Sequence, residues 1–451
     1  MAAQAKTLIE AIGNLKNEPL HKDEFSEFFV DTTEVRGGDE AFPQLKRNLL
    51  NDKLGLKHYL FAGARGCGKS TELMRLQLKL EPEFLVLSYS VKNELEPNNL
   101  THIDLLIATM QKLFEVANNN NIDIPEEYLK PIVNWVSKVS TEEKVSKSYG
   151  AEAEAGGEVK AGFLSLFNVF AKLTSRAKYD RDFTKTIHTE EEHLISELIL
   201  SSNILITEIK QKLKLQKKGL LVIIEDLDKL DLKKGEELFF NYVSRLVALN
   251  MNTIYTFPIA LYYNSQFNIA SNAVDDVLVL PMIKTHYIDG SPKLDGGQYI
   301  LKELLEKRMD LNLFESPQLV MNFIKYCGGA IFDLFRMIRS AANFALNRDR
   351  QKIVESDWIK AFNRSIDDYR SMISDRVEND KIVVTSDQYF TALTRVAEDT
   401  TKQPNNTIVE LQLRQNLCIL SYNDKGWVDV HPLVKEILIE KKLLSDNYRI
   451  Q

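Results

Sequence analysis

The chain has 451 residues, 44% of them hydrophobic, which is too long for one ordinary core and indicates two or three domains. Its formal net charge of -7 argues against a protein that coats nucleic acid by charge alone, although a local basic patch stays open. Three widely spaced cysteines, no secretory leader and no apolar run of about 18 residues indicate a cytoplasmic protein without a membrane segment.

A glycine-rich loop follows the first predicted strand, Tyr59–Ala62, and opens a predicted helix. This phosphate loop reads Gly63-Ala64-Arg65-Gly66-Cys67-Gly68-Lys69-Ser70-Thr71. Glycines permit backbone angles that bring amides close to a phosphate, and the helix adds its free N–H groups. Lys69 supplies a cation for the β- and γ-phosphates, and Ser70 supplies a hydroxyl for Mg²⁺. We therefore predict that these residues bind ATP or ADP with Mg²⁺.

The residues before this strand, 1–58, are predicted to be a linker that folds over the nucleotide base, as in many P-loop ATPases. The pattern predicts a short amphipathic helix from Thr7 to Leu15 and a second helix from Ala41 to Leu50. Arg36, which two glycines follow, is a candidate for the base cradle. The alternative is a solvated arginine in a surface turn.

The next predicted strand is the apolar run Phe84–Val91, which closes a right-handed βαβ unit with the first strand. A helix is predicted from Asn99 to Ala117. Residues 118–215 are too many for a plain connection and are predicted to form a largely helical insertion. Its apolar stretch Phe163–Leu173 is either a helix packed on the domain or an element that binds a partner or a membrane.

An acidic cluster follows five apolar residues, Leu220–Ile224. Ligands bind at the C-terminal ends of parallel strands, where acids can hold Mg²⁺ and orient a water. We predict that Glu225 faces the metal together with Ser70 and that Asp226 contributes to the metal shell and polarises the attacking water. Asp228 is predicted to be a supporting or switch acid. With the lysine of the phosphate loop, Glu225 and Asp226 are the predicted catalytic residues.

The remaining core elements are a helix from Gly235 to Asn250, a strand from Thr253 to Leu261 and a last strand from Val277 to Pro281. Thr256 is a candidate for sensing the γ-phosphate; Asn264 is the rival, and a purely structural threonine is the third interpretation. Five strands that alternate with helices predict an α/β fold of the P-loop NTPase class, with a parallel five-stranded sheet.

The pattern becomes purely helical after the core, which is predicted to span residues 59–290. A helical lid is predicted for residues 291–378, with helices at Gln298–Met309, Pro317–Cys327, Ala330–Leu346 and Ser356–Met372. A winged-helix domain is predicted for residues 379–451, with helices at Asp387–Ala397 and Ile408–Leu417, a hairpin over Cys418–Val430 and a last helix at Pro432–Lys442.

This order of motifs resembles the origin-recognition branch of AAA+ ATPases and the STAND group of NTPases, which includes the NB-ARC proteins. The loop G-A-R-G-C-G-K-S-T-E-L, with E-D-L-D-K further on, is similar to bacterial P-loop ATPases. Most members carry aspartate first in the acidic cluster, so Glu225 is a departure that leaves the division of labour between Glu225 and Asp226 open.

Two further motifs extend the resemblance. The segment Cys327–Arg336 resembles the lid motif G-G-x-P-R-x-L-x-R, but Phe332 stands where a nucleotide-sensing arginine is usual. The resemblance implies that Arg336 or Arg339 takes over that role. Residues 428–434 resemble the Met-His-Asp segment of NB-ARC proteins, which implies that His431 contacts the β-phosphate of ADP and latches a closed state. An ordinary histidine at a strand–helix junction is the alternative.

No arginine occurs between Arg245 and Arg308, where ring-forming AAA+ motors usually present an arginine finger. This absence favours a switch that is closed with ADP and that ATP opens for self-association or for recruiting a separate effector. By family analogy, the switch would serve bacterial defence, such as antiviral defence, or stress signalling. One rival hypothesis is a DNA-associated initiator or transposition regulator that reads DNA with Ile408–Leu417, although one arginine and one glutamate suit phosphates poorly. Another is a nucleotide-binding scaffold with negligible turnover.

Overall fold

The computed structural model of the chain describes residues 3–36, 41–52, 54–122, 124–139, 175, 192–291, 293, 296–378, 380–422 and 426–449. The predicted apolar element Phe163–Leu173 lies outside the described residues, as do the two glycines after Arg36. Among the described residues, no helix is both long enough and apolar enough to cross a membrane.

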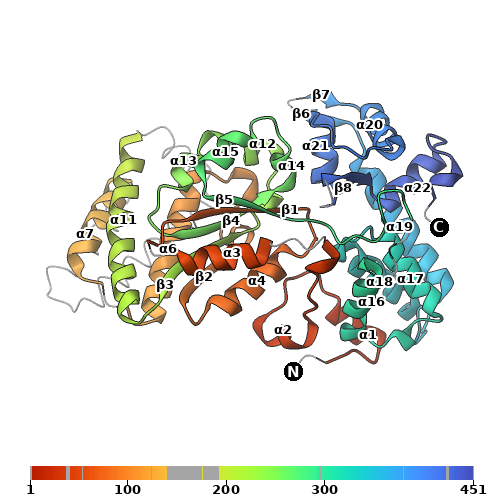
Figure 1. Cartoon of the computed structure of the whole chain (residues 1–451), viewed down its shortest axis with the longest axis horizontal. Helices are drawn as coiled ribbons and strands as arrows, with labels where there is room; N and C mark the ends of the chain where they lie inside the picture. The colour runs from red at the N-terminus through yellow and green to blue at the C-terminus, as the bar shows by residue number, and fades with distance from the viewer. Residues whose placement is uncertain are drawn as a thin grey trace.

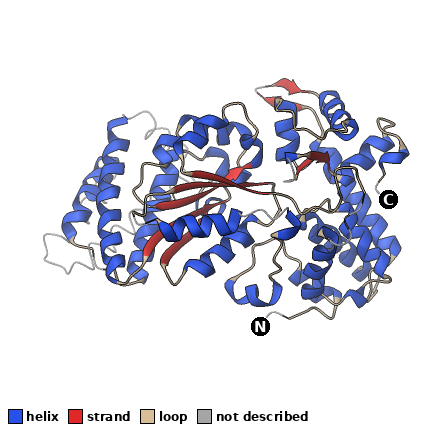
Figure 2. Ribbon diagram, viewed as in Figure 1, coloured by secondary structure: helices blue, strands red, loops and turns tan. Residues whose placement is uncertain are grey.

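A parallel five-stranded sheet lies at the centre of the core (Figures 1 and 2), in the order β2-β3-β4-β1-β5. Its strands are β1 (His58–Gly63), β2 (Phe84–Ser90), β3 (Gly219–Glu225), β4 (Asn252–Pro258) and β5 (Asp276–Leu280). Every residue of β1 and β4 is buried, as expected for central strands that helices cover on both faces. The predicted α/β P-loop fold class is confirmed.

Two groups of helices cover the sheet. Helices α3 and α4 pack together against β1, β2 and β5, whereas α6 and α11 contact each other along β2 and β3, with α7 beside α11 (Figure 1). The core helices are α3 (Ala41–Asn51), α4 (Lys69–Leu80), α5 (Val91–Glu94), α6 (His102–Asn119), α7 (Glu126–Val139), α11 (Glu192–Leu215), α12 (Leu232–Glu236), α13 (Val243–Leu246), α14 (Ile259–Tyr262) and α15 (Phe267–Ala273).

Two predicted core elements were wrong in detail. The single helix predicted for residues 235–250 is broken after α12 by a π-helical turn, η4 (Glu237–Asn241), before α13 begins. Three consecutive apolar residues of this turn are buried, and the Phe239 ring packs edge-on against Phe257 at 4.9 Å. The strand predicted to reach Leu261 ends at Pro258, because proline lacks the N–H that would extend the ladder, and α14 begins there.

The lid (residues 297–372) contains the four predicted helices, with ends within two residues of those expected. They are α16 (Gly297–Arg308), α17 (Pro317–Tyr326), α18 (Ile331–Leu346) and α19 (Glu355–Met372). The Ser316 side chain accepts a hydrogen bond from Leu319 N (3.3 Å) and so caps α17, which has Pro317 in the favoured first position.

The N-terminal segment (residues 3–36) packs on the lid. It contains α1 (Leu8–Asn14), α2 (Lys22–Phe28) and the 3₁₀ turn η1 (Glu34–Arg36). Ala5 forms a parallel bridge with Met309, and its N–H donates to Arg308 O at 3.0 Å. Helix α1 contacts α18, and α2 contacts α16. The segment that was predicted to be a linker therefore packs against the lid.

The C-terminal unit (residues 376–449) contains two helices, a hairpin and a last helix in the predicted order. These are α20 (Ser386–Glu398), α21 (Ile408–Gln415), β8 (Ile419–Ser421) with β9 (Val428–Val430), and α22 (Pro432–Glu440). A second hairpin, β6 (Arg376–Glu378) with β7 (Lys381–Val384), was not predicted. The domain boundary predicted between residues 378 and 379 lies in the turn of this hairpin.

The buried Asp429 connects the C-terminal unit to the rest of the molecule through His286. Asp429 lies 3.0 Å from Lys402 Nζ, 2.6 Å from Lys435 Nζ and 3.2 Å from His286 Nε2, and His286 belongs to the segment between β5 and the lid. Although burial opposes ionisation, the charges of Lys435 and Lys402 and the hydrogen bond with His286 hold the pKa of Asp429 well below its usual range. The Tyr422 hydroxyl donates to Gly328 O of the lid at 3.0 Å.

Candidate nucleotide-binding site

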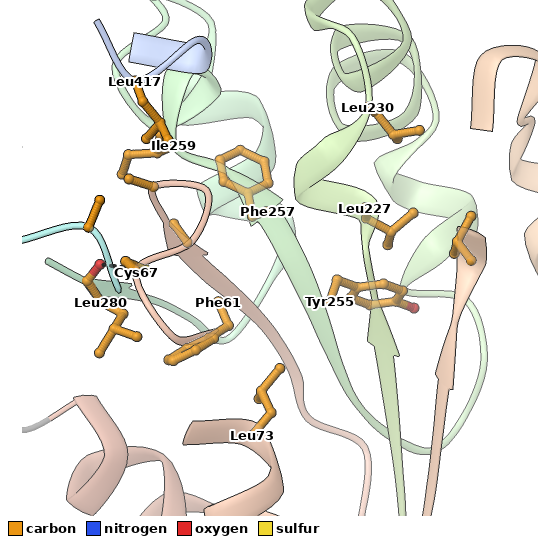
Figure 3. Packing of buried hydrophobic residues seen from close by; sticks show 14 of the residues in the cluster. Phe61, Cys67, Leu73, Leu227, Leu230, Tyr255, Phe257, Ile259, Leu280 and Leu417 are labelled. Atoms are coloured by element: carbon orange, nitrogen blue, oxygen red, sulfur yellow. Dashed lines mark hydrogen bonds between the residues drawn. The ribbon is translucent and has the colours of Figure 1, made fainter. Parts of the chain in front are cut away.

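The phosphate loop connects the end of β1 to the start of α4. Gly66 (φ +72°) and Gly68 (φ +104°) adopt left-handed backbone angles that other residues rarely adopt. Cys67 is fully buried beneath the loop, with its Sγ 3.8 Å from Leu280 O at the end of β5 (Figure 3). Helix α4 begins at Lys69, so its unpaired N–H groups and positive dipole end adjoin the loop.

A cavity of about 440 Å³ lies between the phosphate loop, the N-terminal segment and the lid. Its volume is within the range of small-molecule sites. Its charged and polar floor includes Lys69, Ser70 and Thr71. Its apolar walls come from the N-terminal segment and the lid: Leu20, Phe28, Val30, Leu304, Ile331, Phe332 and Phe335. A cavity with phosphate-binding groups at its floor and apolar walls is suited to a nucleotide.

The ammonium group of Lys69 is buried and already has three partners. It donates to Gly63 O at 2.8 Å and to Ala64 O at 2.9 Å, and it forms an ion pair with Asp228 Oδ2 at 2.8 Å. Burial alone would lower the pKa of Lys69, but the charge and hydrogen bond of Asp228, together with the charges of Cys67 and Asp226, raise that pKa above its usual value.

The acids after β3 separate into different environments. Glu225 is hydrogen-bonded to Ser70 and to Ser88 (3.3 Å), and burial raises the pKa of Glu225 to about 7. Asp226 has a left-handed φ of +69° and bonds Ser90 and Lys229. Although burial opposes it, the hydrogen bonds from Lys229 and Ser90 hold the pKa of Asp226 below its usual value.

The residues predicted to hold Mg²⁺ are partly brought together. The Glu225 carboxyl meets the Ser70 hydroxyl, and both are the oxygen donors that Mg²⁺ prefers, whereas Asp226 is occupied by Ser90 and Lys229. Across the described part of the chain, no group of three or more His, Cys, Asp or Glu could hold a metal ion. A magnesium ion here would therefore depend on nucleotide phosphates and water for its other ligands.

Arg36 is buried against the phosphate loop instead of lying in a solvated turn. Its Nη2 donates to Cys67 O at 2.5 Å, its Nε to Thr32 Oγ1 at 2.8 Å and its Nη1 to Pro281 O. It also lines the cavity. The arginine thus braces the loop from the side of the N-terminal segment, so the alternative of a solvated surface arginine was wrong.

The lid touches the phosphate loop directly through Phe332. Its N–H donates to Gly66 O at 3.3 Å, and the Arg65 guanidinium lies 5.6 Å from the centre of its ring. Arg336 is held inside the lid by Asp333 (2.8 Å) and Asp368 (3.0 Å) and does not line the cavity. Arg339, three residues further along α18, does line it.

Thr256 has its hydroxyl engaged with the backbone. It accepts a hydrogen bond from Leu227 N at 3.0 Å and lies 3.3 Å from Ile224 O. Its rival Asn264 donates to Glu236 at 2.8 Å. Neither residue lines the cavity. Thr256 instead fixes the backbone between β3 and the acids that follow it.

His431 is fully buried where the C-terminal unit meets the lid. Its Nδ1 accepts from Leu433 N at 3.2 Å, so the neutral ring carries its proton on Nε2. That Nε2 is 3.3 Å from Asp333 Oδ2, but the two are poorly aligned for a hydrogen bond. The ring also stacks on Tyr369 at 4.6 Å. In this arrangement His431 joins two parts of the molecule and does not line the nucleotide cavity.

Two residues of this region had not been predicted from the sequence. Arg308 lines the cavity between the rings of Phe28 and Phe335, each 5.2 Å away, and burial lowers the pKa of Arg308 to about 10. Gln415 at the end of α21 donates from Nε2 to Asp228 O (3.3 Å) and Leu230 O (3.0 Å). An arginine in a last helical turn and a glutamine on a helix are ordinary, so neither gave a signal.

Helix α21 packs against the core at this point. The Arg414 guanidinium is fully buried, 4.3 Å from the centre of the Tyr263 ring and 3.3 Å from Glu410. Leu417, directly after α21, belongs to the same buried cluster as Ile259 of α14 (Figure 3). The helix predicted to read DNA in the rival hypothesis therefore has its one arginine inside the protein.

Comparisons with known proteins identify no family. No family model and no curated protein matches the chain. Among solved structures, the chain is similar to the Aeropyrum pernix ORC2 protein, with a TM-score of 0.39 and 10% identity over 96% of this chain and 98% of that one. It is also similar to a Walker-type ATPase of Pyrococcus abyssi (TM-score 0.41, 11% identity, 94% and 99% covered). A third similar structure is the Thermotoga maritima RuvB Holliday junction branch migration motor, with a TM-score of 0.36 and 11% identity over 94% of this chain and 98% of that one.

Proposed function

We propose that this protein is an ATP-binding and slowly hydrolysing molecular switch, closed with ADP and opened by ATP. One observation carries the proposal. The C-terminal unit bonds, through Gln415, to the loop whose Asp228 carboxylate occupies Lys69 of the phosphate loop. A γ-phosphate at Lys69 thus competes with a contact on which the position of the C-terminal unit depends.

In this proposal, ATP occupies the cavity with its phosphates on residues 63–71 and its base against the apolar walls that the N-terminal segment and the lid provide. Ser70 and Glu225 would hold Mg²⁺, which would supply neutralisation of the charge on the phosphates. Asp226 orients the attacking water once it is released from Lys229. Lys69 stabilises the same charge as a fixed cation.

The switch requires that ATP and ADP favour different arrangements of the C-terminal unit. A shift from mostly closed to mostly open needs a differential affinity of about 5 kcal/mol. The open form would self-associate or bind a separate effector protein. By analogy with STAND proteins, the signal would belong to cellular defence, and this part rests on the resemblance alone.

The test measures particle size and ATP turnover. We expect the full chain to bind ADP, to hydrolyse ATP slowly and to change its hydrodynamic size with a non-hydrolysable ATP analogue but not with ADP. Lys69→Ala should abolish both nucleotide binding and the size change. A protein of one constant size that nevertheless turns ATP over would contradict the switch. Failure to bind any nucleotide would contradict the whole proposal.

A further inference from the structure

We propose that Asp228 acts as an internal substitute for phosphate at Lys69 and that Gln415 passes its displacement to the C-terminal unit. The inference rests on the proposed function and assigns to two residues of this chain a positioning role in it. Neither residue touches nucleotide in this role. Each controls whether another group can do so.

The donors of Lys69 provide the first argument. A lysine ammonium has three N–H donors, and the three partners of Lys69 lie at 2.8, 2.9 and 2.8 Å. Two partners, Gly63 O and Ala64 O, belong to the loop itself. Asp228 is the third and the only anion among them. Lys69 meets the β-phosphate of ADP and ATP alike, so we assign the displacement to the γ-phosphate. As a further anion at one cation, the γ-phosphate competes with the Asp228 carboxylate for the third donor of Lys69.

The loop that bears Asp228 is anchored on both sides. Leu227 and Leu230 are buried (Figure 3). The Thr256 hydroxyl accepts a hydrogen bond from Leu227 N at 3.0 Å and fixes it. Asp226, directly before, has a left-handed φ of +69°, which is unusual for a residue other than glycine. With both ends held, a displaced Asp228 side chain cannot be accommodated by sliding the loop. We therefore assign the change to the 3₁₀ turn Leu227–Lys229, which carries Asp228, and not to a shift of the whole loop.

Gln415 is hydrogen-bonded to the backbone of this turn and of the residue that follows it. Its Nε2 donates to Asp228 O at 3.3 Å and to Leu230 O at 3.0 Å, and two carbonyl partners require the amide nitrogen on that side. These bonds connect α21 to the residue that occupies Lys69. A turn that changes conformation removes one or both acceptors, so phosphate at Lys69 weakens the hold of the core on α21. By thermodynamic reciprocity, releasing α21 also favours phosphate at Lys69.

The experiment combines calorimetric nucleotide binding with hydrogen exchange of the α21 amides, using the full chain. In the wild type we expect exchange of residues 408–415 to rise with a non-hydrolysable ATP analogue compared with ADP. Asp228→Asn should bind the analogue about tenfold tighter, because a neutral amide competes poorly for Lys69. Without nucleotide, its α21 should already exchange as fast as in the liganded wild type.

Gln415→Ala should separate the binding of nucleotide from its effect on α21. We expect it to bind the analogue at least as tightly as the wild type, while α21 exchanges fast with and without nucleotide. Asn416→Ala is the matched control, because Asn416 and Gln415 both line a second cavity, of about 470 Å³, beside α21. It should behave as the wild type. Asp228→Ala replaces Asp228→Asn if that variant does not fold.

The outcomes distinguish this inference from the function on which it rests. A wild type that binds no nucleotide overturns the proposed switch. A wild type that changes size with the ATP analogue while its α21 exchange does not respond to nucleotide overturns the inference alone. A wild type that responds, while Asp228→Asn and Gln415→Ala respond in the same way and to the same extent, overturns the inference and leaves the switch standing.

Discussion

Gly66 is the residue at which the lid meets the phosphate loop. A Cβ at this position would lie 2.3 Å from the Phe332 Cβ, and its φ of +72° disfavours other residues. We expect Gly66→Ala to lower the free energy of unfolding by at least about 1–2 kcal/mol, the cost of a left-handed alanine, and to push the lid away. Thermal unfolding and proteolysis of the lid would measure both effects.

Gly13 provides the matched control for this substitution. It lies inside α1, and nothing is within 4 Å of its Cβ position. Gly13→Ala should therefore be neutral or stabilising by up to about 1 kcal/mol. Equal effects of the two alanines would show that the lid does not rest on Gly66.

His58 predicts an acid-sensitive term in stability. Burial lowers the pKa of His58 from 6.5 to about 4, so the folded state excludes a proton that the unfolded state takes up. The stability that depends on this residue is present above pH 6.5 and is lost as pH falls through about 4. Urea unfolding across this window should show a steeper loss for the wild type than for His58→Gln. Parallel curves would contradict the assignment.

Motifs with a fixed chemical role were predictable residue by residue, and their partners were not. The spacing of Gly63, Lys69 and Ser70 identified the phosphate loop, because each has a direct role toward phosphate or metal. Glu225 was placed beside Ser70 as predicted. The pairing of Lys69 with Asp228 depends on where a loop from another strand ends in space, and local spacing carries no information about that.

Helix α21 yields a prediction at the scale of the element. Because Arg414 is buried, we expect the chain to shift no DNA at about 150 mM salt. Arg414→Ala should instead lower the free energy of unfolding by about 3 kcal/mol, since Glu410 loses a buried partner. A gel shift assay measures DNA binding, and urea unfolding measures the loss of stability in Arg414→Ala. Robust binding that Arg414→Ala removes would restore the DNA hypothesis.

Lys442 offers the control for that experiment. It is exposed directly after α22, so Lys442→Ala should leave both stability and DNA binding unchanged.

Elements with strong periodicity were predictable, and those set by tertiary contacts were not. The five strands are apolar runs bounded by turns, and the lid helices have regular apolar spacing, so both were found. The π-helical turn η4 and the early end of β4 were missed, because packing of Phe239 on Phe257 and the proline at 258 override the local pattern. The short hairpin β6–β7 has exposed apolar residues, which gave no alternation to detect.

In the proposed switch, the contact between the lid and the C-terminal unit around His431 stabilises the closed form. His431→Asn keeps an acceptor for the cap of α22 but removes the stack on Tyr369 and the neighbour of Asp333. We expect faster release of ADP and faster proteolysis between lid and C-terminal unit, with α22 intact by circular dichroism. Dissociation of a fluorescent ADP analogue gives the rate. An unchanged rate would favour a merely structural histidine.

The packing of the N-terminal segment on the lid has a consequence for how the molecule is made. Gln4 bonds Glu306 O and Lys6 pairs with Asp310, partners some 300 residues later in the chain. At about 5–20 residues per second, a ribosome needs roughly 15–60 s to add that length. Gln4 and Lys6 must therefore wait for the lid before they can make these contacts. Phe28 and Arg36 of the N-terminal segment enclose the cavity together with the lid. During synthesis the core therefore has its phosphate loop well before the pocket around it is complete.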